Sequence, residues 1–304
     1  MRELIGTHDV LMVTLDTLRY DVAAELAAAG RTPHLAAVLP GGGWERRHSP
    51  ASFTYAAHHA FFAGFLPTPA TPGTPHTPGT PRTMGTPGTP ATPGTPGTGT
   101  PGTPGTGTPG TPGAHDRLFA AAFPGSETSG PGTWVFDAPD LPTALAKEGY
   151  HTLCLGGVGF FNRRTALGEV LPALFTEAHW EPSFGVTEPD CLGAQLARLE
   201  SSLTAVPSGQ PVFTFLNVAA MHQPNRHYAG LAEDTRESHA AALEYVDGLM
   251  PRLFELVTGR GRPVFVIMCA DHGTAYGEDG HTGHRVGHEV VWTVPYAQFT
   301  LAVS

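Results

Sequence analysis

Cysteine, positive charge and long apolar runs are all scarce in this chain of 304 residues. The three cysteines, Cys154, Cys191 and Cys269, lie too far apart for a disulfide framework or a Cys-x-x-Cys metal site. So few thiols favour a reducing compartment. No apolar run approaches the ~20 residues that a helix needs to cross a bilayer, and the first residues lack the layout of a signal peptide. The sequence therefore predicts a soluble, cytoplasmic protein that does not insert into a membrane.

Seventeen lysines and arginines stand against 27 aspartates and glutamates, which gives a formal net charge of −10. Because no basic cluster is present, nucleic acid is not expected as the main partner. A small anionic substrate would need a metal ion to supply local positive charge. The composition predicts no particular oligomeric state.

Residues 67–113 repeat Thr-Pro-Gly and contain almost nothing apolar to bury. Interruptions such as Gly-Thr-Gly break the strict glycine register that a collagen triple helix requires. This composition is typical of an extended, disordered segment. Because the hydrophobic pattern resumes afterwards without a new start, we predict one domain over residues 1–304, interrupted by this insertion.

Buried strands alternate with helices along the rest of the chain. Apolar, β-branched runs predict strands at 9–15, 151–157, 211–219 and 263–271, and a short strand near a sheet edge at 290–299. Amphipathic patterns predict helices at 22–30, 32–39, 52–64, 140–150, 188–204 and 235–259. This alternation predicts an α/β fold with a mostly parallel sheet and helices on both faces.

Acidic residues follow two of the predicted strands. Asp16 closes the first strand, and Asp271, followed directly by His272, closes the late one. Ligands collect outside the carboxyl ends of the strands in open α/β sheets. Carboxylate oxygens and an imidazole together suit a divalent metal ion, whereas each aspartate alone could simply form a turn or cap a helix.

Thr54 lies at the predicted start of the helix at 52–64, and His58 follows one turn later on the same face. A hydroxyl at a helix N-terminus can cap the helix. It can also act as a nucleophile toward an anionic group that the helix amides hold, activated by a metal that lowers its pKa. The sequence leaves both interpretations of Thr54 open.

Three segments resemble, in order, the sulfatase-like branch of the alkaline phosphatase superfamily: "DVLMVTLDTLRYD", "SFTYAAHHAFFAGFLP" and "CADHGTAYGEDGHTGH". The N-terminal segment resembles the family's opening strand and metal-binding aspartate, here Asp16. The middle segment resembles the nucleophile segment, with Thr54 four residues before His58. The C-terminal segment resembles the family's metal-binding run. The resemblance implies that Asp271 and His272 are metal ligands.

The same resemblance implies roles for two further histidines. His284 would be a further contact to metal or substrate. His222, in "FLNVAAMHQPNRHY", follows a predicted strand as His-x-Pro segments do in similar enzymes, and could bind metal or the leaving oxygen. As an alternative, His222 belongs to a polar loop without a function. Asn217, in the same segment, could take the place of a ligating aspartate.

The ligand types leave the metal open. One or two divalent ions are expected, with Zn, Mn, Mg and Ca not distinguished, because mixed carboxylate and imidazole ligands accommodate each of them.

The nucleophile segment departs from the pattern of true sulfatases. Those enzymes convert a Cys or Ser to formylglycine, and Thr54 cannot form that aldehyde because its carbinol carbon carries a methyl group. Tyr-Ala-Ala also replaces the usual x-Pro-Ser after the nucleophile. The resemblance therefore implies a metal-dependent hydrolase of phosphate or phosphonate esters with Thr54 as catalytic nucleophile, assisted by His58 and His222.

Two alternatives stay open. A sulfate-ester hydrolase, or a transferase of phosphoryl or phospho-alcohol groups, would use the same residues. A binding protein without catalytic activity would keep the metal for structure.

Overall fold

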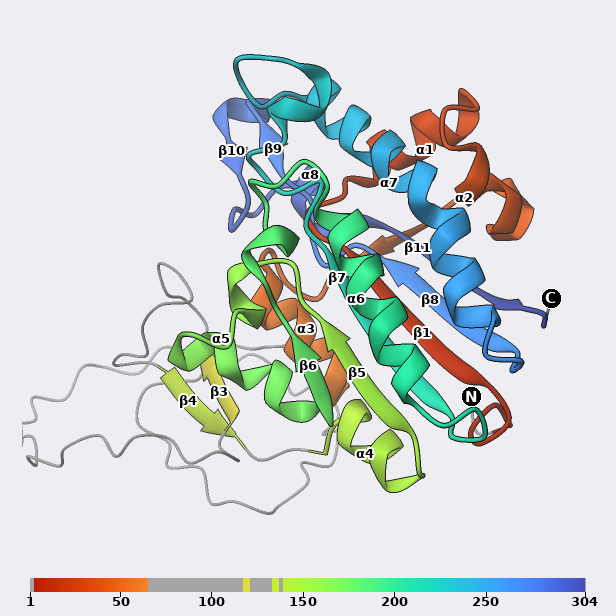
Figure 1. The fold of residues 1–304 in the computed structure, drawn as a ribbon. Helices are drawn as coiled ribbons and strands as arrows, with labels where there is room; N and C mark the ends of the chain where they lie inside the picture. The colour runs from red at the N-terminus through yellow and green to blue at the C-terminus, as the bar shows by residue number, and fades with distance from the viewer. Residues whose placement is uncertain (1–2, 65–116, 121–132, 137–138, 304) are drawn as a thin grey trace, which may run out of the picture.

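The computed structural model describes residues 3–64, 117–120, 133–136 and 139–303, and its main sheet has seven strands in the order β2-β11-β8-β1-β7-β5-β6 (Figure 1). The strands are β1 (Asp9–Leu15), β2 (Glu45–His48), β5 (His151–Leu155), β6 (Glu177–His179), β7 (Val212–Val218), β8 (Val264–Cys269) and β11 (Thr293–Leu301). Two small hairpins pair β3 (Arg117–Ala120) with β4 (Thr133–Phe136) and β9 (Ala275–Tyr276) with β10 (Thr282–Gly283). The predicted insertion at 67–113 lies outside the described residues.

Strands β8, β1, β7, β5 and β6 run parallel, and β11 runs antiparallel to β8 and β2. The fold is therefore the predicted mostly parallel α/β sheet. The late strand was expected to be short and near an edge. It does lie near an edge, because β11 is next to the edge strand β2, but it has nine residues. Pro295 is tolerated there because the ladder between β11 and β8 begins only at Tyr296, and Pro295 contributes only its carbonyl oxygen, which accepts from the Ala270 amide.

Helices cover both faces of the sheet, as the alternating pattern predicts (Figure 1). One face packs against α1 (Tyr20–Ala28), α2 (Pro33–Val38), α6 (Cys191–Ala205) and α7 (Arg236–Thr258). The other packs against α3 (Thr54–Ala63), α4 (Leu141–Lys147) and α5 (Ala166–Val170), while α8 (Glu289–Trp292) directly precedes β11. No helix among the described residues combines the length and apolarity needed to cross a membrane.

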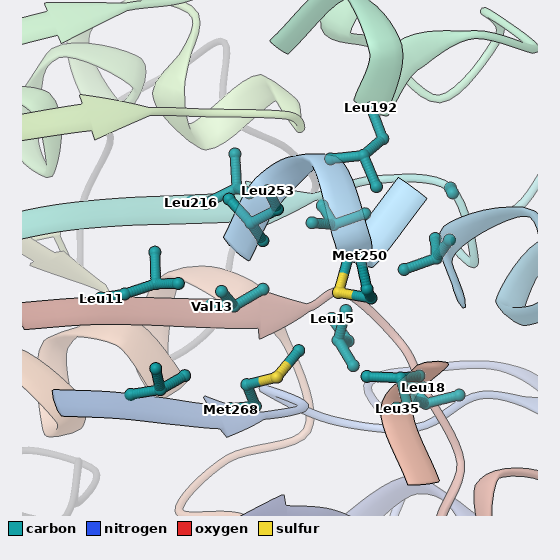
Figure 2. Packing of buried hydrophobic residues seen from close by; sticks show 14 of the residues in the cluster. Leu11, Val13, Leu15, Leu18, Leu35, Leu192, Leu216, Met250, Leu253 and Met268 are labelled. Carbon is teal, nitrogen blue, oxygen red and sulfur yellow. The ribbon is translucent and has the colours of Figure 1, made fainter. Parts of the chain in front are cut away.

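Strand β1 is buried on both sides, because its residues alternate between two hydrophobic layers. Leu11, Val13 and Leu15 point to the layer under α7, where Met250 and Leu253 meet them (Figure 2). Val10 and Met12 face the other layer, which contains α3 and several phenylalanine rings. This double burial fixes the position of the carboxyl end of β1, at which the candidate site lies.

Helix α7 passes through Pro251 without ending there. The helix extends from Arg236 to Thr258, and Pro251 within it is exposed to solvent. Thr235 caps the helix, accepting from the Ser238 amide while the Ser238 hydroxyl accepts from the Thr235 amide. Burial of one helix face therefore outweighs the hydrogen bond that proline removes.

The far end of β1 is anchored by a buried carboxylate. Asp9 accepts from Arg260 Nε at 3.1 Å, from Arg262 Nε at 3.0 Å and from the Val212 amide at 3.0 Å. Removing one member of a buried charge cluster leaves its partners without a counter-charge, which typically costs about 3–5 kcal/mol. Asp9→Ala is expected to lower the free energy of unfolding by about 3 kcal/mol, measured by urea denaturation.

A matched control for Asp9 is the ion pair between Glu45 and Arg47, in which both side chains are more than half exposed. Glu45→Ala is expected to change the free energy of unfolding by less than about 0.5 kcal/mol, because exposed ion pairs contribute little. Equal effects of the two substitutions would contradict the anchoring role of Asp9.

Candidate metal centre

The carboxyl ends of β1 and β8 bring three potential ligands together. These strands are parallel neighbours, so Asp16 after β1 and Asp271 and His272 after β8 meet at one edge of the sheet. One ligand atom from each residue lies within 4.8 Å of the others, and all three side chains are fully buried. The sequence motifs therefore converge on one spot.

The two carboxylates each have one anchored and one unpartnered oxygen. Asp271 Oδ1 accepts from the amides of Thr17 (3.2 Å) and His272 (3.0 Å), and Asp16 Oδ2 accepts from Asn217 Nδ2 (3.1 Å). Asp16 Oδ1 and Asp271 Oδ2 are buried and lack a hydrogen-bond partner among the described residues. Unpartnered buried carboxylate oxygens are costly on their own, and a divalent cation satisfies both.

The orientation of the His272 ring also suits a metal. Its Nδ1 donates to the carbonyl oxygen of Gly273 at 2.9 Å, so the lone pair lies on Nε2. Nε2 is 3.6 Å from Asp271 Oδ2 and 4.0 Å from Asp16 Oδ1. Burial lowers the pKa of His272, which favours the neutral imidazole that metals bind.

Thr54 is the first residue of α3 and places its hydroxyl beside these ligands. Thr54 Oγ1 is 3.4 Å from Asp16 Oδ2 and 3.3 Å from His272 Nε2. The N-cap of α3 is Phe53, so the Thr54 hydroxyl does not cap the helix. Of the two interpretations left open by the sequence, the geometry excludes the cap.

His58 lies directly behind Thr54 but does not contact its hydroxyl. His58 Nδ1 is 2.7 Å from the Thr54 carbonyl oxygen, and Nε2 is 3.0 Å from the hydroxyl of Thr14. Burial lowers the pKa of His58 to about 3, so its ring is neutral. A direct catalytic role for His58 would require a proton path from the ring to the Thr54 hydroxyl. The ring contacts the backbone of Thr54 instead.

Two further histidines line the same site. The His284 ring lies 4.6 Å from the His272 ring and 5.3 Å from the His222 ring, measured between centroids. His222 Nδ1 donates to the Gln223 carbonyl oxygen at 2.6 Å, which leaves a lone pair on Nε2. Burial, reinforced by the two neighbouring histidines, lowers the pKa of His284. The structure thus brings both predicted histidines to the metal-binding group.

A model of the family described as Sulfatase matches residues 136–296, slightly more than half of the chain. The chain belongs to the sulfatase family. The matched range includes Asp271, His272, His222 and His284 but begins after Asp16 and Thr54. Those two residues are placed at the site by the fold.

Solved structures extend this likeness to almost the whole chain. The C-terminal periplasmic domain of phosphoethanolamine transferase EptC from Campylobacter jejuni is 11% identical, with a TM-score of 0.54 over 97% of this chain and 80% of that one. The C-terminal periplasmic domain of EcEptC from Escherichia coli, in complex with zinc, is 11% identical, with a TM-score of 0.56 over 97% and 73%.

A protein of the alkaline phosphatase superfamily from Vibrio parahaemolyticus is also 11% identical, with a TM-score of 0.54 over 98% of this chain and 61% of that one. At such identity the likeness concerns the fold, which is that of the alkaline phosphatase superfamily. No curated protein matches the sequence significantly.

A buried polar cluster that the sequence did not reveal joins the loops of this sulfatase-family site. Tyr276 accepts at its hydroxyl from Asn225 Nδ2 (2.8 Å) and from His239 Nδ1 (3.0 Å), and His239 Nε2 accepts from the Arg19 amide (3.3 Å). Arg19 follows β1, Asn225 follows β7 and Tyr276 follows β8. The cluster therefore links the segments that follow these three strands. Arg19, Asn225 and Tyr276 lie within the sequence segments singled out above, but nothing in those segments indicated that they contact one another.

Arg19 strengthens the same connection. Its side chain is 3% exposed, pairs with Asp21 at 2.7 Å and with Glu278, and donates to the Thr274 carbonyl oxygen. His288 has a structural role, because it caps α8 by accepting from the Val290 amide.

Zinc affinity is expected to rise with pH up to about pH 7. Burial raises the pKa of Asp271 to about 7, and burial together with the Asp271 carboxylate raises that of Asp16 to about 6. Metal-free folded protein therefore holds protons that zinc must displace, about tenfold in affinity per pH unit for each proton. Calorimetric titrations between about pH 5.5 and about pH 8 measure this slope.

The stability of the metal-free protein has the opposite pH dependence. Because both pKa values lie above the ordinary value near 4, the folded state binds more protons than the unfolded state between about pH 4 and pH 7. These groups thus favour folding at low pH and less so as pH rises. A zinc affinity that does not change over this range would contradict the protonated state of the two carboxylates.

Proposed function

We propose that this protein is a metal-dependent hydrolase of phosphate or phosphonate esters that uses Thr54 as its nucleophile. The observation that carries the proposal is the Thr54 hydroxyl, 3.3 Å from His272 Nε2 and 3.4 Å from Asp16 Oδ2, at the first residue of a ten-residue helix. The helix N-terminus adds partial positive charge next to the place where an anionic ester would lie.

Asp16, Asp271, His272 and the Thr54 hydroxyl would hold the cation. A divalent ion bound there supplies positive charge that lowers the pKa of the hydroxyl and offsets the charge of the ester. Zinc is the first candidate, because carboxylate and imidazole donors suit it and the similar domain from Escherichia coli was solved with zinc. Manganese, magnesium and calcium are the others to test.

The residues of the chain then divide the reaction between them. Thr54 Oγ1 forms a bond to phosphorus as the bond to the leaving alcohol breaks, which produces a phosphothreonine. Asp16 Oδ2 is positioned to receive the hydroxyl proton. The leaving alkoxide takes its proton from solvent, and His222 and His284 can contact its oxygen. Water then attacks phosphorus as the bond from phosphorus to Thr54 Oγ1 breaks; the lone pair on His222 Nε2 can accept the proton of this water, and the proton held by Asp16 returns to Oγ1.

A transferase is the second candidate, because the similar domain from Campylobacter jejuni belongs to a phosphoethanolamine transferase. The first half of the reaction would be unchanged, and an alcohol would replace water in the second half. Sulfate esters are less favoured, since the methyl group of Thr54 prevents formation of the sulfatase aldehyde.

One experiment separates these possibilities. Zinc-loaded protein is incubated with chromogenic phosphate monoesters, phosphate diesters, phosphonate esters and sulfate esters, each with and without added alcohol. The hydrolase predicts phosphate release without alcohol, and the transferase predicts a new ester only with alcohol. If the protein bound zinc but turned over no ester, the result would favour a metal-containing binding protein without catalytic activity.

A further inference from the structure

A chain of buried hydrogen bonds runs behind the metal-binding group and joins Asp16 to the backbone of Thr54. Asn217 Nδ2 is 3.1 Å from Asp16 Oδ2 and 3.2 Å from Thr14 Oγ1. Thr14 Oγ1 is 3.0 Å from His58 Nε2, and His58 Nδ1 is 2.7 Å from the Thr54 carbonyl oxygen. The side chains of Asp16, Asn217, Thr14 and His58 are fully buried, so water does not compete for these bonds.

The orientation of the Asn217 amide follows from its other contacts. The backbone amides of Gly157 and Val158 both donate to one side-chain atom of Asn217, at 3.2 Å each, and that atom must be the oxygen. The NH₂ group therefore faces Thr14 and Asp16 and donates to both. The sequence suggested that Asn217 could replace a ligating aspartate, but its amide nitrogen points at Asp16, and a nitrogen in that state cannot bind a cation.

The tautomer of His58 follows in the same way. A carbonyl oxygen only accepts, so His58 Nδ1 carries the ring proton and donates to Thr54. Nε2 of the neutral ring then accepts from the Thr14 hydroxyl. Asp271 Oδ2, 3.8 Å from Nδ1, is too distant for a hydrogen bond. Four aromatic rings pack around the imidazole: Phe61, Phe62, Phe161 and Phe215.

We propose that Asn217, Thr14 and His58 form a positioning relay that sets the distance between the nucleophile Thr54 and the metal ligand Asp16. The relay connects the first turn of α3 to the paired strands β1 and β7. His58 acts through the Thr54 backbone and exchanges no proton with the substrate. The positioning role of the relay rests on the proposed function of Thr54 as the nucleophile. Its pattern of hydrogen bonds does not depend on that function.

The bond pattern is tested by NMR of protein labelled with ¹⁵N-histidine, without any substrate. His58 signals are assigned by their loss in His58→Gln. The relay predicts a proton on Nδ1, an unprotonated Nε2 that accepts a hydrogen bond, and a loss of that bond in Thr14→Val. A proton on Nε2, or signals unaffected by Thr14→Val, would overturn the relay. Because wild-type protein supplies the main result, misfolding of Thr14→Val does not remove the test.

The positioning role is tested by kinetics. Thr14→Val keeps the shape of the side chain and removes the hydroxyl, so kcat is expected to fall about 10–100-fold with KM changed less than about threefold. Thr14→Ser keeps the hydroxyl and is expected to restore kcat. The matched control is Thr152→Val on β5, whose buried hydroxyl accepts from the Thr176 amide away from the site; its kcat should equal that of wild type.

Each outcome has one meaning. Wild-type kcat in Thr14→Val, or an equal loss in Thr152→Val, would overturn positioning by the relay. Zinc affinity measured on the same variants separates misplacement of Thr54 from loss of the metal. If wild-type protein turned over no ester, the proposed function would fail while the NMR result would still decide the bond pattern.

Discussion

Thr54→Ala is expected to reduce kcat for phosphate esters by at least about 1,000-fold, because it removes the atom that attacks phosphorus. Zinc should still bind, since Asp16, Asp271 and His272 keep their three ligand atoms within 4.8 Å of one another. Steady-state kinetics on a chromogenic phosphate ester, together with calorimetric titration of zinc, measures both quantities on the same sample.

The control for this variant is Thr54→Ser, which keeps the hydroxyl and loses only the methyl group. It should retain a measurable fraction of the wild-type kcat. Full activity in Thr54→Ala would remove Thr54 as the nucleophile. Joint loss of activity and zinc would instead assign the hydroxyl a structural role in the metal-binding group.

Asp271→Asn is expected to lower zinc affinity by at least about 100-fold and to remove turnover, because it deletes a ligand charge at nearly unchanged shape. The same change should stabilise the metal-free protein above pH 7, since burial raises the pKa of Asp271 to about 7 and its charge is costly there. Zinc affinity and the melting temperature of metal-free protein therefore change in opposite directions.

Asp279→Asn serves as the control for Asp271, because Asp279 is an exposed carboxylate in the same C-terminal region that pairs with His288. It should leave zinc affinity and kcat unchanged. If Asp271→Asn destabilised the metal-free protein at high pH, the account would be contradicted. The charged carboxylate would then stabilise the fold without a metal ion, through its protein contacts.

The order of strands and helices could be predicted because burial leaves a strong periodic pattern. Residues 9–15, 211–219 and 263–271 are mostly apolar since helices cover both faces of the sheet. Strand β2 left no such pattern, because Glu45–His48 is exposed and polar at the edge of the sheet. Pro295 correctly indicated that β11 lies near an edge, but the edge strand β2 that pairs with it could not be derived from the sequence.

The members of the site could be predicted to the extent that they follow strands or begin a helix. Asp16, Thr54, Asp271 and His272 all do so, and the fold brings them together. The direction of His58 was not predictable, since helical spacing places a residue on a face without saying which atoms its ring contacts.

Thr14 and Asn217 were missed as partners for a similar reason. Both lie within strands, where a threonine or asparagine in an apolar run carries no signal of a specific bond. Their pairing depends on the register of β1 and β7, which aligns Thr14 with Asn217. That register follows from the three-dimensional packing of the sheet.

The central claim is that Thr54 attacks the ester from within a metal-binding group. Zinc-loaded protein is mixed with a phosphate ester, quenched in acid during turnover, digested and analysed by mass spectrometry. The claim predicts one phosphoryl group on the peptide that contains Thr54, at the threonine itself and absent from Thr54→Ala. A phosphoryl group on another residue, or sustained turnover in Thr54→Ala, would contradict it.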